Sequence, residues 1–63
     1  MSSAERHLHA AQTHTEAADR HDAASRHWTQ RDDTERADLE RRKAVIEREA
    51  ADIERERARL ADA

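Results

Sequence analysis

The feature that most constrains this chain is a seven-residue repeat that runs through both halves of the sequence. In the first half it places large side chains at His7, His14, His21 and Trp28 and small ones at Ala4, Ala11, Ala18 and Ser25. In the second half it places aliphatic side chains at Leu39, Ile46, Ile53 and Leu60. Because seven residues return an α-helix to nearly the same side, each set forms one stripe along a helix. The repeat therefore predicts an all-α, coiled-coil-like protein.

The composition is compatible with either a helical or a disordered chain. The 63 residues contain no Gly, Pro, Cys, Phe or Tyr, so the residues that usually shape turns and sheets are scarce. Charged residues make up 43% of the chain and apolar ones 35%, a balance that suits a disordered segment. The regular period favours helices instead, and we expect residues 1–63 to form a single helical unit.

A change of direction is predicted near the middle of the chain. Residues 29–35 contain two Asp and two Thr, and Asp32 followed by Glu35 resembles a capping box that would start a new helix. We therefore expect an antiparallel two-helix hairpin with helices at about residues 3–29 and 33–62 and a turn at about 30–33. The alternative is one continuous coiled-coil helix, because the repeat keeps the same phase through the middle of the sequence.

The hairpin suggests how its two helices pack. A turn centred near Asp32 sets each small residue of the first half level with a Leu or Ile of the second, for example Ala18 with Ile46. We expect this bulky stripe to pack on the Ala and His stripe, with Leu8 and Trp28 closing the ends. The predicted packing and partner-binding residues are Ala11, Ala18, Trp28, Leu39, Ile46, Ile53 and Leu60. A further stripe, Ala37, Ala44, Ala51 and Ala58, lies about 200° away and is interpreted as an outer, helix-forming surface or a second close contact.

The composition favours a structural or interaction module that is not an enzyme. Because the chain has few large apolar side chains, an isolated monomer is expected to have low stability. We therefore expect self-association into a helical bundle or docking on a helical partner. No phosphate-binding loop, Cys nucleophile or His-Glu-x-x-His run is present. The net charge of −3 gives little support to nucleic-acid or membrane-surface binding. The longest apolar run, Ala44 to Ile46, is too short for a membrane span, and a cytoplasmic location is expected.

The histidines support an alternative function, a small protein that binds zinc, nickel or copper. Neutral imidazole is a common ligand of these metals, and His7, His14 and His21 share one face. Neighbouring members lie about 10.5 Å apart along a helix, too far to share an ion, so such a site would need an oligomer interface. Within the hairpin, His14 is predicted to lie near Glu49 and His7 near Glu56, where the carboxylate would orient the imidazole.

Overall fold

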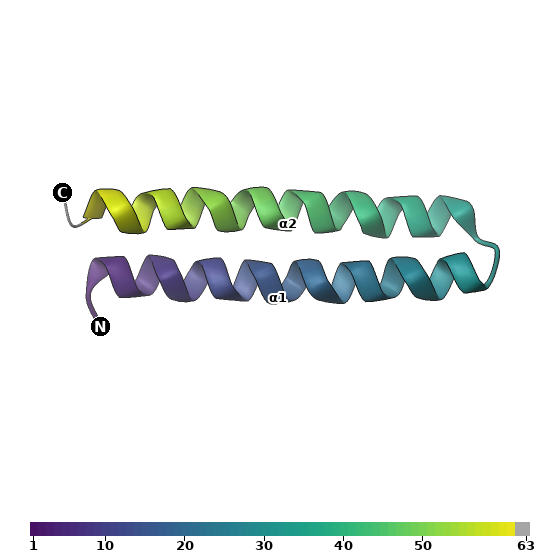
Figure 1. The fold of residues 1–63 in the computed structure, drawn as a ribbon, viewed down its shortest axis with the longest axis horizontal. Coiled ribbons are helices and arrows are strands. Elements are labelled where there is room, and N and C mark those ends of the chain that lie inside the picture. Colours follow the sequence, from purple (N-terminus) through teal and green to yellow (C-terminus); the bar gives the residue numbers. More distant parts are fainter. Residues whose placement is uncertain (62–63) are drawn as a thin grey trace.

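A computed structural model describes residues 1–61 as two α-helices joined by a tight turn (Figure 1). Helix α1 spans Ser3–Gln30 and helix α2 spans Thr34–Ala61. The helices run antiparallel, so that α1 begins at the end of the molecule where α2 finishes, and the hairpin is 48 Å long. The predicted hairpin is confirmed, and the alternative of one continuous helix is wrong. The helix bounds agree with the predicted ones to within one residue, and residue 62 lies outside the described range.

Both helices begin at a polar side chain that accepts hydrogen bonds from the backbone. The Ser2 Oγ accepts from the Glu5 N–H at 3.1 Å, and the Glu5 carboxylate accepts from the Ser2 N–H at 3.3 Å, which forms a capping box. The Asp33 carboxylate accepts from the Arg36 N–H at 3.0 Å at the start of α2. The predicted cap at Asp32 is therefore wrong by one residue. Asp32 instead has φ 59° and turns the chain, a left-handed conformation that Asp tolerates better than most residues.

The two helices meet along an inner seam of six buried alanines. The inner seam consists of Ala4, Ala11 and Ala18 from α1 and Ala44, Ala51 and Ala58 from α2. Ala18 exposes none of its surface and Ala51 only 1%. Because a methyl group is the largest side chain at these positions, the backbones approach closely. The Ser25 hydroxyl donates to the Ala37 carbonyl of the other helix at 2.8 Å, which also requires this closeness.

The predicted packing of the Leu and Ile stripe against α1 is wrong. Leu39, Ile46, Ile53 and Leu60 are all exposed, and Ile46 exposes 62% of its surface. The second alanine stripe, which lies about 200° around α2 from the large residues, faces α1 instead. Its small side chains let the two helices come closer. Leu8 is also exposed and closes no end of a core. Trp28, at the end of α1, is half-buried.

Candidate docking face and its histidine–glutamate row

Three hydrogen bonds between histidine and glutamate side chains connect α1 to α2 beside the inner seam. The Nδ1 atoms of His7, His14 and His21 lie 2.7, 2.6 and 2.7 Å from the carboxylate oxygens of Glu54, Glu47 and Glu40, respectively. We call these six residues the His–Glu row. All six side chains are half-buried, the glutamates more deeply than the histidines. The repeat of seven in both helices gives the row its even spacing.

The approach of histidine to glutamate was predicted, but the named partners were wrong. His14 pairs with Glu47 rather than lying near Glu49, and His7 pairs with Glu54 rather than lying near Glu56. Both shifts are two residues in the same direction. The alanine stripe that faces α1 precedes the Leu and Ile stripe by two residues in every repeat, so this one difference in packing moves the whole register.

In two of the three pairs, the pKa of the glutamate indicates which ring nitrogen of the histidine carries the hydrogen. Hydrogen bonds from His21 and His7 hold the pKa values of Glu40 and Glu54 below their usual range, although partial burial opposes the shift. Lys43 and Arg57 lower the same two pKa values further by their charges. An ionised carboxylate can only accept hydrogen bonds, so the Nδ1 atoms of His7 and His21 carry the hydrogen. The outer Nε2 atoms of these two rings are not needed for this bond.

The row does not by itself form a metal centre. Within residues 1–61 no group of three or more His, Cys, Asp or Glu side chains is placed to hold one ion. His7, His14 and His21, the predicted ligands, each pair with a different carboxylate. A metal bound at any of them would need further ligands from another chain.

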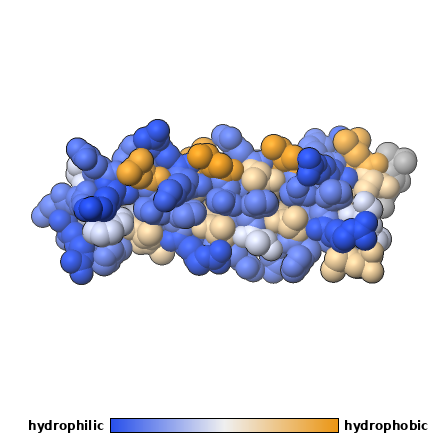
Figure 2. Space-filling model, turned by 180° about the vertical axis from the view of Figure 1, so that it is seen from behind, coloured by the Kyte–Doolittle hydropathy of each residue, from blue (hydrophilic) through white to orange (hydrophobic). Residues whose placement is uncertain are grey.

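Apolar side chains lie on both sides of the His–Glu row. On α2 the exposed residues Leu39, Ile46, Ile53 and Leu60 form a line that we call the outer ridge. On α1 the half-buried residues Ala10, Ala17 and Ala24 repeat at the same spacing and form what we call the alanine row. Helical geometry places the alanine row on the side of the hairpin that carries the His–Glu row, and the outer ridge along the outer edge of α2 on that same side. Figure 2 shows this side, which we call the back face: separate orange patches recur along the edge of α2, and paler apolar patches follow α1.

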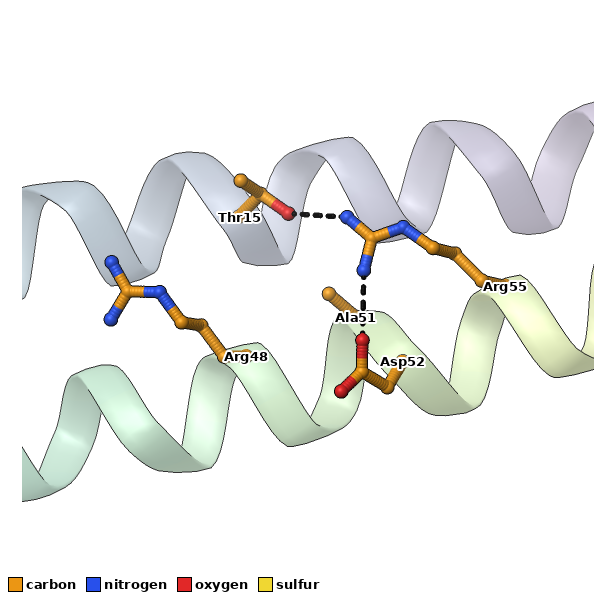
Figure 3. A pocket seen from close by; sticks show the side chains of 5 residues that line it. All are labelled: Thr15, Arg48, Ala51, Asp52 and Arg55. Atoms are coloured by element: carbon orange, nitrogen blue, oxygen red, sulfur yellow. Dashed lines mark hydrogen bonds and ion pairs between the residues drawn. The ribbon is translucent and has the colours of Figure 1, made fainter.

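The opposite side of the hairpin carries paired charges, together with the exposed side chains of Leu8 and Val45. A shallow groove there is lined by Thr15, Arg48, Ala51, Asp52 and Arg55 (Figure 3). Arg55 donates to Thr15 at 3.1 Å and to Asp52 at 3.0 Å, and Arg48 pairs with Asp19 and Asp22. The bond from Arg48 lowers the pKa of Asp22. Because carboxylates already neutralise both guanidinium groups, this groove has little attraction for an anion.

Trp28 is held beside the turn by its neighbours. The Arg36 guanidinium carbon lies 5.0 Å from the centroid of the Trp28 ring, and the His27 ring meets it edge-on at 5.1 Å. Of the other predicted partner-binding residues, Ala11 and Ala18 are buried within the hairpin itself, whereas the four residues of the outer ridge are accessible.

No protein-family model, curated protein or solved structure matches this chain. Over residues 1–61, neither helix contains a stretch that is both long enough and apolar enough to cross a membrane. The function is therefore inferred from the residues and their arrangement.

Proposed function

We propose that this chain is a non-enzymatic interaction module that self-associates through its back face. One observation carries the proposal: the four largest aliphatic side chains of α2 recur at every seventh residue along one side of the helix and are all exposed, and Ile46, near the middle of this row, exposes 62% of its surface. A regular row of exposed Leu and Ile side chains on a chain so rich in charge is typical of a surface that another protein covers. The opposite side of the hairpin has paired charges and only the separate exposed apolar side chains of Leu8 and Val45.

The small core of the hairpin supports the same proposal. The buried apolar side chains within residues 1–61 are six alanines, and no large side chain is fully buried. Burial of a methyl group stabilises a fold far less than burial of a Leu or Ile, which contributes about 1.5–3 kcal/mol. Association would bury the outer ridge and add this missing contribution. Because a partner that binds only the folded chain stabilises it, folding and association are expected to be coupled.

A pair of matched substitutions tests the proposal. Ile46→Asp places one charge in the outer ridge, whereas Val45→Asp places one on a neighbouring exposed aliphatic residue outside it. We expect sedimentation equilibrium to give a multiple of the 7.3 kDa chain mass for the wild type and for Val45→Asp, and a monomer for the ridge variant. A wild-type chain that stays monomeric at millimolar concentration would refute self-association.

The His–Glu row favours metal binding as a second candidate function. A histidine that ligates a metal commonly donates its other ring N–H to a carboxylate, which is the arrangement that His7 and His21 adopt with Glu54 and Glu40. Calorimetric titration with zinc, nickel and copper would test it. If the row binds metal, we expect the wild type to bind with about micromolar or tighter affinity. His21→Ala should weaken this binding, and His9→Ala, which alters an exposed histidine outside the row, should leave it intact. Absence of binding by the wild-type chain would exclude this function.

A further inference from the structure

We infer that two copies of this chain dock back face to back face about a two-fold axis parallel to the helices, so that each outer ridge packs on the alanine row of the other copy. This inference rests on the proposed self-association and specifies its geometry. The occupant of the back face is thus a second copy, and the product is a four-helix bundle.

The size of the face fits such a pair. The hairpin measures 48 Å by 16 Å between Cα atoms across its broad side, an area of roughly 770 Å². Each partner of a stable protein interface typically buries about 800 Å². A face-to-face pair of hairpins therefore reaches the usual size only if the copies overlap along their whole length, which a symmetric arrangement provides.

The shape of the face is complementary to itself. The outer ridge and the alanine row run parallel to each other on opposite sides of the His–Glu row. The pairing of His14 with Glu47 sets the levels of the two helices. At these levels, the ridge residues Leu39, Ile46 and Ile53 lie within about two residues of Ala24, Ala17 and Ala10, respectively. Rotation about an axis along the His–Glu row exchanges the two lines, so large side chains of one copy meet small ones of the other at every repeat.

The direction of the helices is compatible with this axis, and side-chain size distinguishes it from the alternative. Rotation about the long axis of the hairpin places α1 of one copy over α2 of the other, so every pair of adjacent helices is antiparallel, as in up-and-down four-helix bundles. An axis across the helices would also give antiparallel neighbours, but it would stack ridge on ridge and alanine on alanine. Side chains would then hold the helices apart at one edge and leave a void at the other, which protein interiors avoid.

The polar row at the centre of the face is compatible with burial between two copies. Each glutamate of the row already accepts a hydrogen bond from a histidine. Glu40 also lies 3.5 Å from the Lys43 ammonium group, and Glu54 lies 2.9 Å from the Arg57 guanidinium group. Polar groups with such partners can be covered at a much lower cost than unpaired ones. The row therefore forms a polar layer between two apolar lines.

Thiol cross-linking tests the geometry, because the natural chain contains no cysteine. An Ala17→Cys chain is mixed with an Ile46→Cys chain, refolded together and oxidised gently, and the linked species are separated by mass. We expect the mixed disulfide to dominate, since these two positions face each other across the inferred interface within the reach of a disulfide, about 4.4–6.8 Å between Cα atoms. A mixture of Ile46→Cys and Ile53→Cys chains reports the alternative, ridge on ridge, and is expected to form little mixed disulfide.

The outcomes separate the geometry from the proposed function. If the Ile46 and Ile53 mixture links efficiently instead, or if neither mixture links although sedimentation shows a dimer, the inferred axis is wrong and self-association stands. If unoxidised wild-type chains sediment as monomers, both are wrong, and the back face would have to bind a different protein. Efficient linking of Ala17→Cys to Ile46→Cys, together with a dimeric wild type, supports both.

Discussion

The inner seam and the outer ridge occupy the same helix, α2, at the same spacing, yet they have opposite environments. Ala44, Ala51 and Ala58 are buried against α1, whereas Leu39, Ile46, Ile53 and Leu60 face outward. Within a single hairpin, hydrophobicity alone would favour the reverse. The comparison shows that small side chains can form the contact between the two helices of a hairpin in place of large ones. They do so here because they allow the backbones to approach closely and the histidines to reach the glutamates.

The two regions also stabilise the protein in different ways, one within each hairpin and the other through association. The inner seam offers close van der Waals contact but little apolar area, and the His–Glu row beside it adds three interhelical hydrogen bonds. The outer ridge offers apolar area that a lone hairpin does not use. We therefore expect substitutions in the inner seam to act on each chain, and substitutions in the outer ridge to act through association.

The largest expected effect is that of a large residue in the inner seam. Ala18→Leu adds three carbon atoms where no surface is exposed, so the helices must separate and the His–Glu bonds on either side must lengthen. We expect a loss of about 3 kcal/mol, the upper end of the usual cost of overpacking, at every protein concentration. Ala23→Leu, on an exposed position of the same helix, is the control and should be nearly neutral. Thermal unfolding followed by circular dichroism measures both, and equal effects would contradict the assignment of the inner seam.

A smaller effect is expected from truncation of the outer ridge. Ile46→Ala removes exposed apolar surface, so it should leave the helix content of a concentrated sample unchanged and weaken association by about 2 kcal/mol per chain. The melting temperature of the wild type should rise with protein concentration, and that of the variant should be lower at each concentration. A melting temperature that does not depend on concentration in either chain would show that the ridge is not buried on association.

The His–Glu row predicts a loss of stability in acid. Hydrogen bonds from His21 and His7 lower the pKa values of Glu40 and Glu54 from the usual 4.5, so these carboxylates stabilise the fold fully above that pH. Their contribution should be lost as the pH falls through the lowered values. Glu40→Gln combined with Glu54→Gln should flatten the fall in melting temperature between pH 5 and about 2. Glu49→Gln, which alters an exposed carboxylate outside the row, should leave the acid profile close to that of the wild type.

The smallest expected effect lies at the turn, outside both regions. Arg36→Gln removes the cation above the Trp28 ring and should cost about 0.5 kcal/mol, as exposed cation–π contacts do. The emission of Trp28, the one tryptophan of the chain, should shift at the same time. Arg59→Gln is the control, because Arg59 pairs with Glu56 near the other end of the hairpin, far from Trp28. An unchanged emission spectrum in the Arg36 variant would contradict the stacking.

The sequence predicted the hairpin, the bounds of its helices and a row of histidines facing glutamates, because all three depend on local periodicity. It could not select which stripe of α2 faces α1. Two stripes share one period and differ by two residues, and the choice between them depends on the distance between helices, which only the folded pair defines. The cap at Asp33 was missed for a related reason, since Asp32 and Asp33 are both suited to cap a helix and only one can also adopt the left-handed turn.

The inner seam has one further property: it is almost translationally symmetric. Sliding α2 by seven residues would again set alanine against alanine and histidine against glutamate. The side chains alone therefore do not distinguish registers that differ by one heptad. The short connection through Arg31, Asp32 and Asp33 fixes the register, because it is too tight to permit a shift of seven residues. Adding one heptad to each helix would lengthen the rod by about 10.5 Å and keep every existing contact. The number of heptads therefore sets the length of the hairpin, and the contacts between the helices stay the same.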